Sequence, residues 1–210
     1  MIEGILAVSP KSEEDLPRLF ETAEPFPPLE ALFDQVRPLE IEIGCGKGNF
    51  LVQLARQRPD GNYLGIDRVV KWMRTGIRKG EKLGLRNIKF VKAEACEFLK
   101  RFIPPDSVHV FHVNFPDPWP KRRHRKRRLV NASFLRMLHE RLCPGGCVEL
   151  TTDFEDYFQE MRRAAETTAG LWNRIRESTN ERLLGEGLQS SYERKFETRG
   201  INRYYLELVK

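Results

Sequence analysis

One carboxylate stands beside the densest positive charge of the chain. Asp117 lies between Pro116 and Pro118, and residues 121–128, which we call the basic strip, run Lys-Arg-Arg-His-Arg-Lys-Arg-Arg. The two prolines restrict the backbone around Asp117 and give its carboxylate a defined direction. The basic strip holds seven Lys or Arg residues while the formal net charge is +6, so the rest of the chain sums to −1. Such local charge is typical of a polyanion-binding surface, and an acid beside it suggests chemistry on a nucleic acid.

Each of these features also has a simpler explanation. An Asp in a proline-rich turn is often a turn cap, and Trp119 either stacks on a base or wedges the turn against the core. A run of like charges is often a solvated surface or a targeting signal. We expect His124, within so much positive charge, to be a neutral contact residue rather than a catalytic base. Because the strip follows the turn directly, we favour phosphate binding, by Arg122, Arg123, Arg125, Lys126, Arg127 and Arg128.

A glycine-rich segment forms a second candidate site. Gly44, Gly46 and Gly48 alternate with Cys45 and Lys47, and we call residues 44–48 the glycine loop. Glycines allow tight turns and close approach of a ligand to the backbone, and the helix expected after the loop offers free N–H groups. The G-x-G-x-G spacing differs from the G-x-G-x-x-G of dinucleotide-binding folds.

Acidic residues follow three successive expected strands. Glu42 precedes the glycine loop, Asp67 comes 19 residues after it, and Glu94 follows the third strand. We expect Glu42 to meet an ammonium group, Asp67 a ribose diol and Glu94 an adenine amino group. Together they suit a cationic nucleoside such as S-adenosylmethionine better than a pyrophosphate. A nucleotide ligand remains an alternative, as does a structural role in which glycines turn the chain and acids cap helices.

The elements that position these residues follow a regular α/β alternation. Short apolar runs predict strands at 39–43, 62–66, 87–92, 107–113, 147–151 and 203–209. Helical spacing of apolar residues predicts helices at 49–58, 69–82, 95–102, 131–142 and 154–168, with Asn131 as a cap. The alternation predicts a doubly wound, mostly parallel sheet that places ligands at the carboxyl ends of its strands. We expect residues 1–37 to be a proline-rich N-terminal leader and 38–210 to be the domain.

The composition excludes several classes of protein. With 210 residues, 40% of them apolar and 31% charged, the chain is expected to form a soluble globular domain. No apolar stretch approaches the ~20 residues that span a membrane, and no signal peptide is evident, so the cytoplasm is the expected compartment. Cys143 and Cys147 have three intervening residues and lack further ligands for zinc, so we expect no metal. Disulfides are not expected in a reducing compartment.

From about residue 39 to its end, the sequence resembles the bacterial tRNA (guanine-N7)-methyltransferases. The resemblance rests on E-I-G-C-G-K-G-N-F at 42–50, G-I-D at 65–67, N-F-P-D-P-W-P-K-R-R-H-R-K-R-R at 114–128, T-D-F at 152–154 and S-Y-E-R-K-F at 191–196. The P-D-P-W-P-K block with its basic continuation is highly specific, whereas many methyltransferases share the glycine loop. The resemblance implies a seven-stranded Rossmann-like sheet of the class I methyltransferase type.

The resemblance also implies roles for individual residues. In that family the acids matching Glu42, Asp67 and Glu94 bind S-adenosylmethionine. The acid matching Asp117 lies between donor and acceptor, so Asp117 is expected to contact the donor as well, and it is treated as catalytic. Positions that contact the guanosine match Lys121, Asp153 and a C-terminal T-x-[YF]-E segment, which here is Ser190, Ser191, Tyr192 and Glu193. Ser190 replaces the usual Thr, and a second alignment through residues 195–197 remains open. Asp67 stands where Glu is common.

The implied reaction is methyl transfer from S-adenosylmethionine to N7 of a guanosine in tRNA, at position 46 of the variable loop. N7 has a lone pair and no proton, so the enzyme must align the reacting atoms rather than remove a proton. Asp117 is then expected to position the base or stabilise developing positive charge, and the base to leave its stack. We expect a monomer or homodimer. The alternatives are a methyltransferase for another RNA site or for protein, and a non-catalytic RNA-binding module.

Overall fold

The structure, a computed structural model, describes residues 19–21, 26–184 and 187–210. The chain divides into two compact units, Met1–Pro104 and Pro105–Lys210, which we call unit 1 and unit 2 and describe separately. Of the expected N-terminal leader, residues 1–18 and 22–25 lie outside the described residues. Its remainder contributes β1 (Leu19–Glu21) and α1 (Leu29–Leu32) to unit 1.

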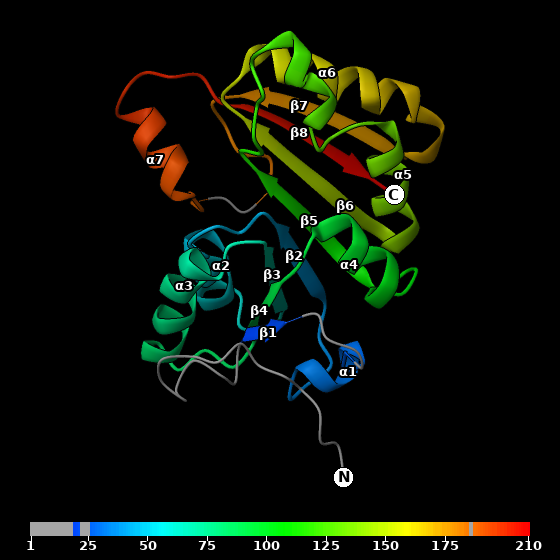
Figure 1. Ribbon diagram of the computed structural model, residues 1–210. Coiled ribbons are helices and arrows are strands. Elements are labelled where there is room, and N and C mark those ends of the chain that lie inside the picture. Colours follow the sequence, from blue (N-terminus) through cyan, green and yellow to red (C-terminus); the bar gives the residue numbers. More distant parts are fainter. Residues whose placement is uncertain (1–18, 22–25, 185–186) are drawn as a thin grey trace. The chain divides into compact units, whose positions relative to one another are not determined.

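Unit 1 is built on parallel strands in the order β1-β4-β3-β2 (Figure 1). All five residues of β2 are buried, as expected of a parallel strand that is covered on both faces. The strands and helices predicted from the sequence agree with the observed ones to within a few residues. The bounds are β2 (Leu39–Ile43), α2 (Asn49–Gln57), β3 (Asn62–Asp67), α3 (Val70–Lys82), β4 (Ile88–Lys92) and α4 (Ala95–Phe102).

The buried ring of Phe90 on β4 sets how closely α2 and α3 approach each other. A Cβ atom at Gly48, which caps α2, would lie 2.7 Å from this ring, and one at Gly76 of α3 would lie 2.8 Å from it. A Cβ at Gly76 would also lie 3.0 Å from the Cα of Gly48. Gly65 on β3 is equally close to the ring, at 2.8 Å. Packing therefore explains a glycine inside α3, which helix propensity alone disfavours by about 1 kcal/mol.

Unit 2 carries strands in the order β5-β6-β8-β7. β5 and β6 are parallel, and β8 is antiparallel to both of its neighbours. α5 packs against α6, and both contact β6, whereas α7 stands apart from them (Figure 1). The bounds are β5 (Val108–Asn114), α5 (Ala132–Arg141), β6 (Leu142–Thr152), α6 (Glu155–Thr167), β7 (Arg174–Thr179), α7 (Ser191–Glu197) and β8 (Tyr204–Val209), with short 3-10 helices η2 (Arg122–Arg127) and η3 (Ala169–Leu171).

Unit 2 confirms one of the elements predicted from the sequence in detail and differs from the prediction at β6, β7 and α7. The predicted cap of α5 is confirmed, because the Asn131 side chain accepts a hydrogen bond of 3.0 Å from the Phe134 N–H. β6 begins at Leu142, before the predicted start, since Leu142 pairs with Val108 ahead of an irregular register. β7 and α7 were not assigned from the sequence: β7 is almost wholly exposed and has no apolar alternation, and α7 has only seven residues.

Candidate functional site

The carboxyl ends of β2, β3 and β4 bring the three candidate donor-binding acids to one end of the unit 1 sheet. Glu42 is the penultimate residue of β2, Asp67 is the last residue of β3, and Glu94 follows β4. The strands are neighbours in parallel register, with Ile43 opposite Ile66 and Asp67 opposite Lys92. Neighbouring parallel strands end at the same side of a sheet, so these acids share a single ligand-binding edge.

Asp67 braces the glycine loop. Its Oδ2 accepts a hydrogen bond of 2.8 Å from the Gly46 N–H, and its Oδ1 accepts one of 2.8 Å from the Val69 N–H. Gly44 and Gly46 have φ angles of +74° and +52°, and no described atom lies within 4 Å of where their Cβ atoms would stand. The loop is thus held by Asp67 while its surface leaves room for a ligand against the backbone. Each carboxylate oxygen retains acceptor capacity beyond these two bonds.

The electrostatic environment of the glycine loop favours positive charge. Burial raises the pKa of the Cys45 thiol well above its usual value, and the negative charges of Glu42 and Asp67 raise it further. Glu42 itself is buried, with 3% of its surface exposed. Burial opposes a thiolate and a cation alike, but the negative charges of Glu42 and Asp67 repel a thiolate and attract a cation. The loop therefore suits a positively charged ligand better than a pyrophosphate.

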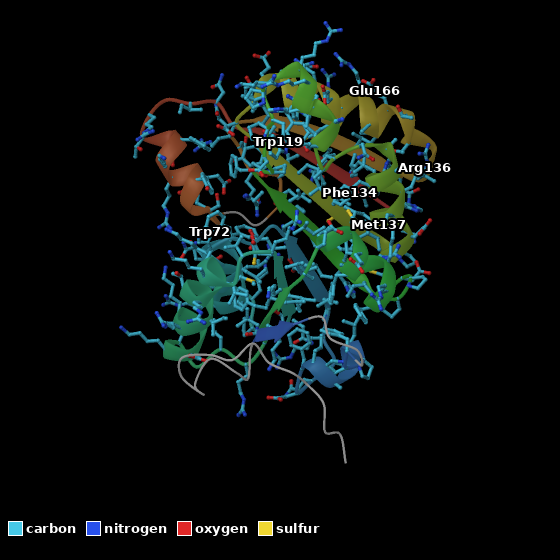
Figure 2. All side chains as sticks on the ribbon, in the orientation of Figure 1. Trp72, Trp119, Phe134, Arg136, Met137 and Glu166 are labelled. Carbon is cyan, nitrogen blue, oxygen red and sulfur yellow. The ribbon has the colours of Figure 1, made fainter. Side chains whose placement is uncertain are left out.

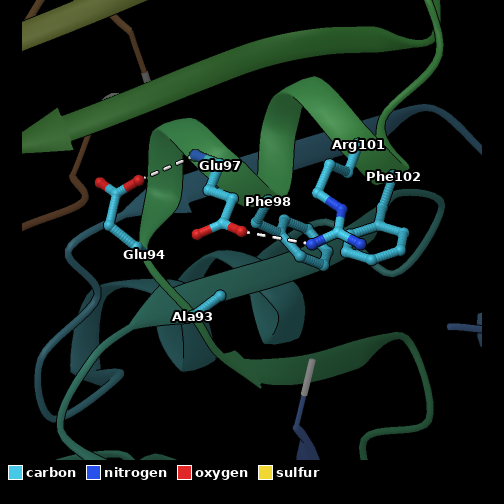
Figure 3. Close-up of a pocket in the computed structure, with 6 residues that line it drawn as sticks. All are labelled: Ala93, Glu94, Glu97, Phe98, Arg101 and Phe102. Atoms are coloured by element: carbon cyan, nitrogen blue, oxygen red, sulfur yellow. Dashed lines mark hydrogen bonds and ion pairs between the residues drawn. The ribbon is translucent and has the colours of Figure 1, made fainter. Parts of the chain in front are cut away.

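Glu94 has a structural role at the start of α4. Its Oε2 accepts a hydrogen bond of 2.8 Å from the Glu97 N–H, which makes it the cap of the helix. The helix-capping alternative raised from the sequence therefore describes part of what Glu94 does. Beside it lies a small open hollow, shown in Figure 3 and lined by Ala93, Glu94, Glu97, Phe98, Arg101 and Phe102.

In unit 2, the turn that carries Asp117 follows β5, and Asp153 follows the neighbouring strand β6. The Phe115 N–H donates to the Thr151 carbonyl at 2.8 Å, so both acids lie at the same end of this sheet. Phe115 and Trp119 have φ angles of +51° and +41°, a strained backbone of the kind that clusters at functional sites. The Asp117 carboxylate is exposed, and we find no hydrogen bond or ion pair to it from any described residue. Its position does not support the turn-cap alternative.

Trp119 packs against the basic strip. Its ring lies 4.9 Å from the guanidinium carbon of Arg127, and the ring of His124 meets it edge-on at 5.8 Å. Figure 2 shows Trp119 among the side chains of unit 2. Both partners belong to the basic strip and not to the core, so these contacts tie the turn to the strip and leave both alternatives for Trp119 open.

The basic strip is anchored to α6 by its last arginine. The Arg128 side chain is 2% exposed, and it pairs with Asp156 at 2.9 Å and with Glu160 at 2.8 Å. Its Nε donates to the Pro118 carbonyl at 2.8 Å, and its guanidinium lies 4.8 Å from the ring of Tyr157. A hydrogen bond from Arg128 lowers the pKa of Asp156, which keeps that carboxylate ionised. The expectation that Arg128 contacts RNA is corrected, because its charge is buried against these two acids.

The other strip residues differ in how accessible they are. Arg125 also pairs with Asp156 and Glu160, at 3.0 and 3.5 Å, but remains 40% exposed. The remaining cations project from η2 or its ends into solvent, and within the described residues none of Lys121, Arg122, Arg123 and Lys126 has a hydrogen bond or ion pair. The strip therefore offers a polyanion a smaller set of free charges than its sequence suggests.

Three aromatic rings join α7 to the end of β5. The ring of Phe115 lies 5.3 Å from that of Phe196 and 5.8 Å from that of Tyr192, and the last two are 6.0 Å apart. Tyr192 is 56% exposed. The cluster places the predicted substrate-binding residue Tyr192 at the same end of the sheet as Asp117. Phe115 and Phe196 were not identified as site residues from the sequence, since isolated aromatics carry no spacing signal.

Glu193, a predicted substrate contact, is buried within a hydrogen-bonded network. Its carboxylate accepts from Arg182 Nε and Nη2 at 3.1 and 2.9 Å, from the Ser190 N–H at 2.6 Å and from the Tyr205 hydroxyl at 2.8 Å. The Ser190 hydroxyl accepts from the Glu193 N–H, which completes a capping box at the start of α7. Burial opposes ionisation of Glu193, but the nearby Arg182 outweighs it and lowers the pKa of the carboxyl.

Arg182 links this network to the ends of the strands. It also donates to Glu149 of β6, and its Nη2 lies 2.8 Å from the Asn114 Oδ1 at the end of β5. Glu149 lies 3.3 Å from the Nδ1 of His112. The sequence signal for Glu149 and His112 was a polar residue within an apolar strand. Arg182, in an irregular segment, gave no signal.

No three His, Cys, Asp or Glu side chains among the described residues gather closely enough to hold a metal ion. None of the described helices combines the length and the apolar character needed to cross a membrane.

The fold is the Rossmann-like fold of class I methyltransferases. The structure is similar to that of a 16S rRNA methyltransferase, KamB, with a TM-score of 0.63 and 17% identity over 86% of this chain and 91% of that one. It is also similar to phosphoethanolamine N-methyltransferase 2 of Haemonchus contortus in complex with S-adenosyl-L-methionine, with a TM-score of 0.55 and 16% identity over 87% of this chain and 51% of that one. The predicted α/β class with a mostly parallel sheet is confirmed, and the described residues contain the seven expected strands and the short β1.

The relatives in sequence identify the family of this chain more narrowly than the fold does. Residues 36–206 match the family described as "Putative methyltransferase". The chain is 37% identical to the tRNA (guanine-N(7)-)-methyltransferase of Rubrobacter xylanophilus over 195 residues, which cover 92% of this chain and 86% of that protein. The chain belongs to the tRNA (guanine-N(7)-)-methyltransferase family, as the motifs of its sequence indicated.

Proposed function

We propose that this protein transfers the methyl group of S-adenosylmethionine to N7 of a guanosine in tRNA, at position 46 of the variable loop. The observation that carries the proposal is the arrangement in unit 2. The exposed carboxylate of Asp117 follows a strained turn and shares one end of the sheet with the ring of Tyr192, and the basic strip continues directly from that turn. Membership of the family supplies the substrate class.

The ligand-binding edge of unit 1, at the carboxyl ends of β2, β3 and β4, suits S-adenosylmethionine as the methyl donor. Bound there, the donor would supply a methyl group on a positively charged sulfur. We assign Glu42 to its ammonium group, the spare acceptor capacity of Asp67 to the ribose hydroxyls, and Glu94 to the adenine amino group. Gly44, Gly46 and Gly48 let the backbone approach the ligand. The negative surroundings of Cys45 support this assignment, because they favour a cationic ligand.

The residues of unit 2 would position the guanine. N7 carries a lone pair, so the chain needs no general base, and the purine becomes cationic as the new bond forms. We assign Asp117 and Asp153 to the N–H edge of the base and to its developing positive charge, and Tyr192 to stacking on its face. Ser190 and Glu193 would act by holding α7 in place. Lys121 and the exposed cations of the basic strip would bind the tRNA backbone.

The proposal also includes the extent of the methyltransferase domain and the cellular compartment of the protein. Residues 38–210 would form the methyltransferase domain, which agrees with the family match at 36–206. We place the activity in the cytoplasm, where the tRNA substrate would be found.

The test is methylation of unmodified tRNA. The protein is incubated with a tRNA transcript and S-adenosylmethionine labelled in its methyl group, and the RNA is then cleaved chemically at 7-methylguanosine. We expect label in the RNA and cleavage at position 46. Label in protein but not in tRNA, or at a different base atom, would overturn the proposal.

Asp117→Asn tests the assigned carboxylate. We expect kcat to fall about 100-fold because the base loses its alignment, while the affinity for S-adenosylmethionine stays within about twofold. Glu166→Gln, which removes an exposed carboxylate of α6 (Figure 2), is the matched control and should keep full activity. If Asp117→Asn instead lowers the melting temperature and the donor affinity together, Asp117 stabilises the turn and the assignment is wrong.

A further inference from the structure

Helix α3 of unit 1 presents a second basic surface, which none of the motifs described above includes. Its sequence, with the preceding Arg68, contains six Lys or Arg residues against one acid, Glu81. Five of these cations have no ion pair or hydrogen bond to any described residue, and we call them the α3 basic face: Arg68, Lys71, Arg78 and Lys82, which are exposed, and Arg74, which is half-buried. The sixth cation, Lys79, donates a hydrogen bond to Asn49 and is left out of the set.

The α3 basic face is continuous along the helix. Lys71, Arg78 and Lys82 project within about 40° of one another, and Arg74 widens the arc to about 80°, at 3.6 residues per turn. The stripe from Lys71 to Lys82 is about 16 Å long, with a cation roughly every turn. The opposite side of α3 buries Met73 and Ile77. The helix therefore packs through its apolar side and leaves its charged side to solvent.

Helix stability does not explain this arrangement. Like charges three or four residues apart on a helix repel, and opposite charges at that spacing would stabilise it. Lys71, Arg74, Arg78 and Lys82 form consecutive pairs of like charge, and among the described residues none of the four has an ion pair or hydrogen bond. Repulsion between these cations destabilises the free protein, and an anionic partner would relieve that repulsion.

An exposed aromatic residue, Trp72, lies beside the α3 basic face. It lies in the first turn of α3, beside Lys71, and 51% of its surface is exposed (Figure 2). The first turn of α3 follows Asp67, so Trp72 stands at the donor-binding end of unit 1. Cations that follow a backbone, bordered by a ring that can stack on a base, are the features of a nucleic-acid surface. A membrane surface would instead require an exposed apolar face on the helix, and that face of α3 is buried.

We propose that the α3 basic face binds the phosphate backbone of the tRNA substrate, with Trp72 stacking on an unpaired base. This inference rests on the proposed function for its substrate. It adds a contact surface on the donor-binding unit to the basic strip, which lies in the other unit. The expected contribution is to affinity rather than to the chemical step.

The first experiment measures tRNA binding by the full chain as a function of salt. The variant carries Lys71→Gln, Arg78→Gln and Lys82→Gln, because Gln keeps helix propensity and removes charge. We expect its Kd for an unmodified tRNA transcript to rise about tenfold or more near 0.15 M salt, and the slope of log K against log salt to decrease by about 2. At saturating tRNA, kcat should stay within about twofold while KM rises.

A matched control removes the same charge from exposed positions elsewhere. Lys100→Gln, Arg136→Gln and Arg163→Gln take one cation each from α4, α5 and α6. We expect this triple variant to bind tRNA within about twofold of the unchanged protein. Equal weakening by both triple variants, or none by the α3 variant, would overturn the inference. Trp72→Ala should weaken binding about tenfold with an unchanged salt slope, because stacking displaces no counterions; wild-type affinity in this variant would remove Trp72 from the surface.

Vesicle binding and methylation activity distinguish an RNA-binding face from a membrane-binding face and from failure of the proposed function. Binding to vesicles of phosphatidylcholine and phosphatidylserine that the α3 variant loses, with tRNA affinity unchanged, would assign the face to a membrane and overturn the inference. The binding titration needs no turnover. A protein that methylates no tRNA but loses tRNA affinity in the α3 variant would therefore contradict the proposed function while supporting the RNA surface.

Discussion

Arg123 and Arg128 belong to the same basic strip but have opposite surroundings. Arg123 is exposed and has no partner among the described residues, whereas Arg128 is buried against Asp156 and Glu160. The burial of Arg128 follows from its place after η2, where the chain turns toward α5. Within a strip of identical charges, the charge of an arginine therefore does not distinguish a structural role from RNA binding. The partners of its side chain make that distinction.

We predict different defects for the two arginines. Arg128→Gln should lower the melting temperature by about 5 °C, because it removes the hydrogen bonds that hold the strip to α6. Arg123→Gln should leave the melting temperature unchanged and weaken tRNA binding severalfold, with a salt slope lower by about 1. Thermal unfolding and a salt titration of tRNA binding measure both effects. A normal melting temperature for Arg128→Gln would show that its contacts do not stabilise the fold.

At the scale of elements, α7 depends on a buried charge network for its position. The helix is seven residues long, too short to be stable by itself in water. Glu193 ties it to Arg182 and Tyr205, and Arg182 in turn reaches Asn114 at the end of β5. The network therefore places Tyr192 relative to the turn that carries Asp117.

The lowered pKa of Glu193 predicts a pH dependence of stability. A carboxyl whose pKa is lower in the folded protein stabilises the fold above the unfolded-state value, about 4.3, and that contribution disappears as the pH falls through the folded-state value. At pH 7 we expect Glu193→Gln to lower the free energy of unfolding by about 2 kcal/mol. The difference from the unchanged protein should stay constant above about pH 5 and shrink below about pH 4.

Urea unfolding of both proteins between pH 3 and pH 8 measures this difference, within about the accuracy of the linear extrapolation. Glu197→Gln, an exposed carboxyl of the same helix, is the control and should show no such trend. A difference that does not change with pH would mean that the charge of Glu193 does not contribute.

The sequence predicted the elements whose apolar pattern is strong and missed those that depend on tertiary contacts. Strands β2 to β6, strand β8 and every helix from α2 to α6 were assigned, because burial imposes a regular apolar spacing, whereas the short β1 and α1 were not. β7 is an exposed edge strand held by pairing with β8, and α7 is held by Arg182, a residue distant in the chain. The strand-end acids were likewise predictable from position, whereas the partners of Arg128 and Glu193 required the fold.

At the scale of the whole molecule, the two halves of the proposed reaction belong to different compact units. The donor-binding acids lie in unit 1 and the substrate-positioning residues in unit 2. The basic charge is divided in the same way, between the α3 basic face and the basic strip. Each ligand should therefore respond mainly to changes in its own set of residues.

We predict that donor and tRNA affinities can be altered separately. Asp67→Asn should weaken S-adenosylmethionine binding about tenfold or more, because it removes a charged hydrogen-bond acceptor, and leave tRNA affinity within about twofold. Arg122→Gln with Arg123→Gln and Lys126→Gln should do the reverse. Calorimetry with the donor and filter binding with tRNA test both, and a loss of both affinities in one variant at unchanged stability would show that the sites are coupled.

The contact of Phe90 with three glycines has a consequence for how the family can vary. A Cβ atom added at Gly48, Gly65 or Gly76 would come within 2.8 Å of the same Phe90 ring. Gly76→Ala should be less destabilising when position 90 is made smaller, although contacts of 3.0 Å with the Gly48 Cα and the Lys47 carbonyl oxygen would remain. The core therefore excludes a side chain at Gly48 independently of any ligand, but it places no such limit on Gly44 and Gly46.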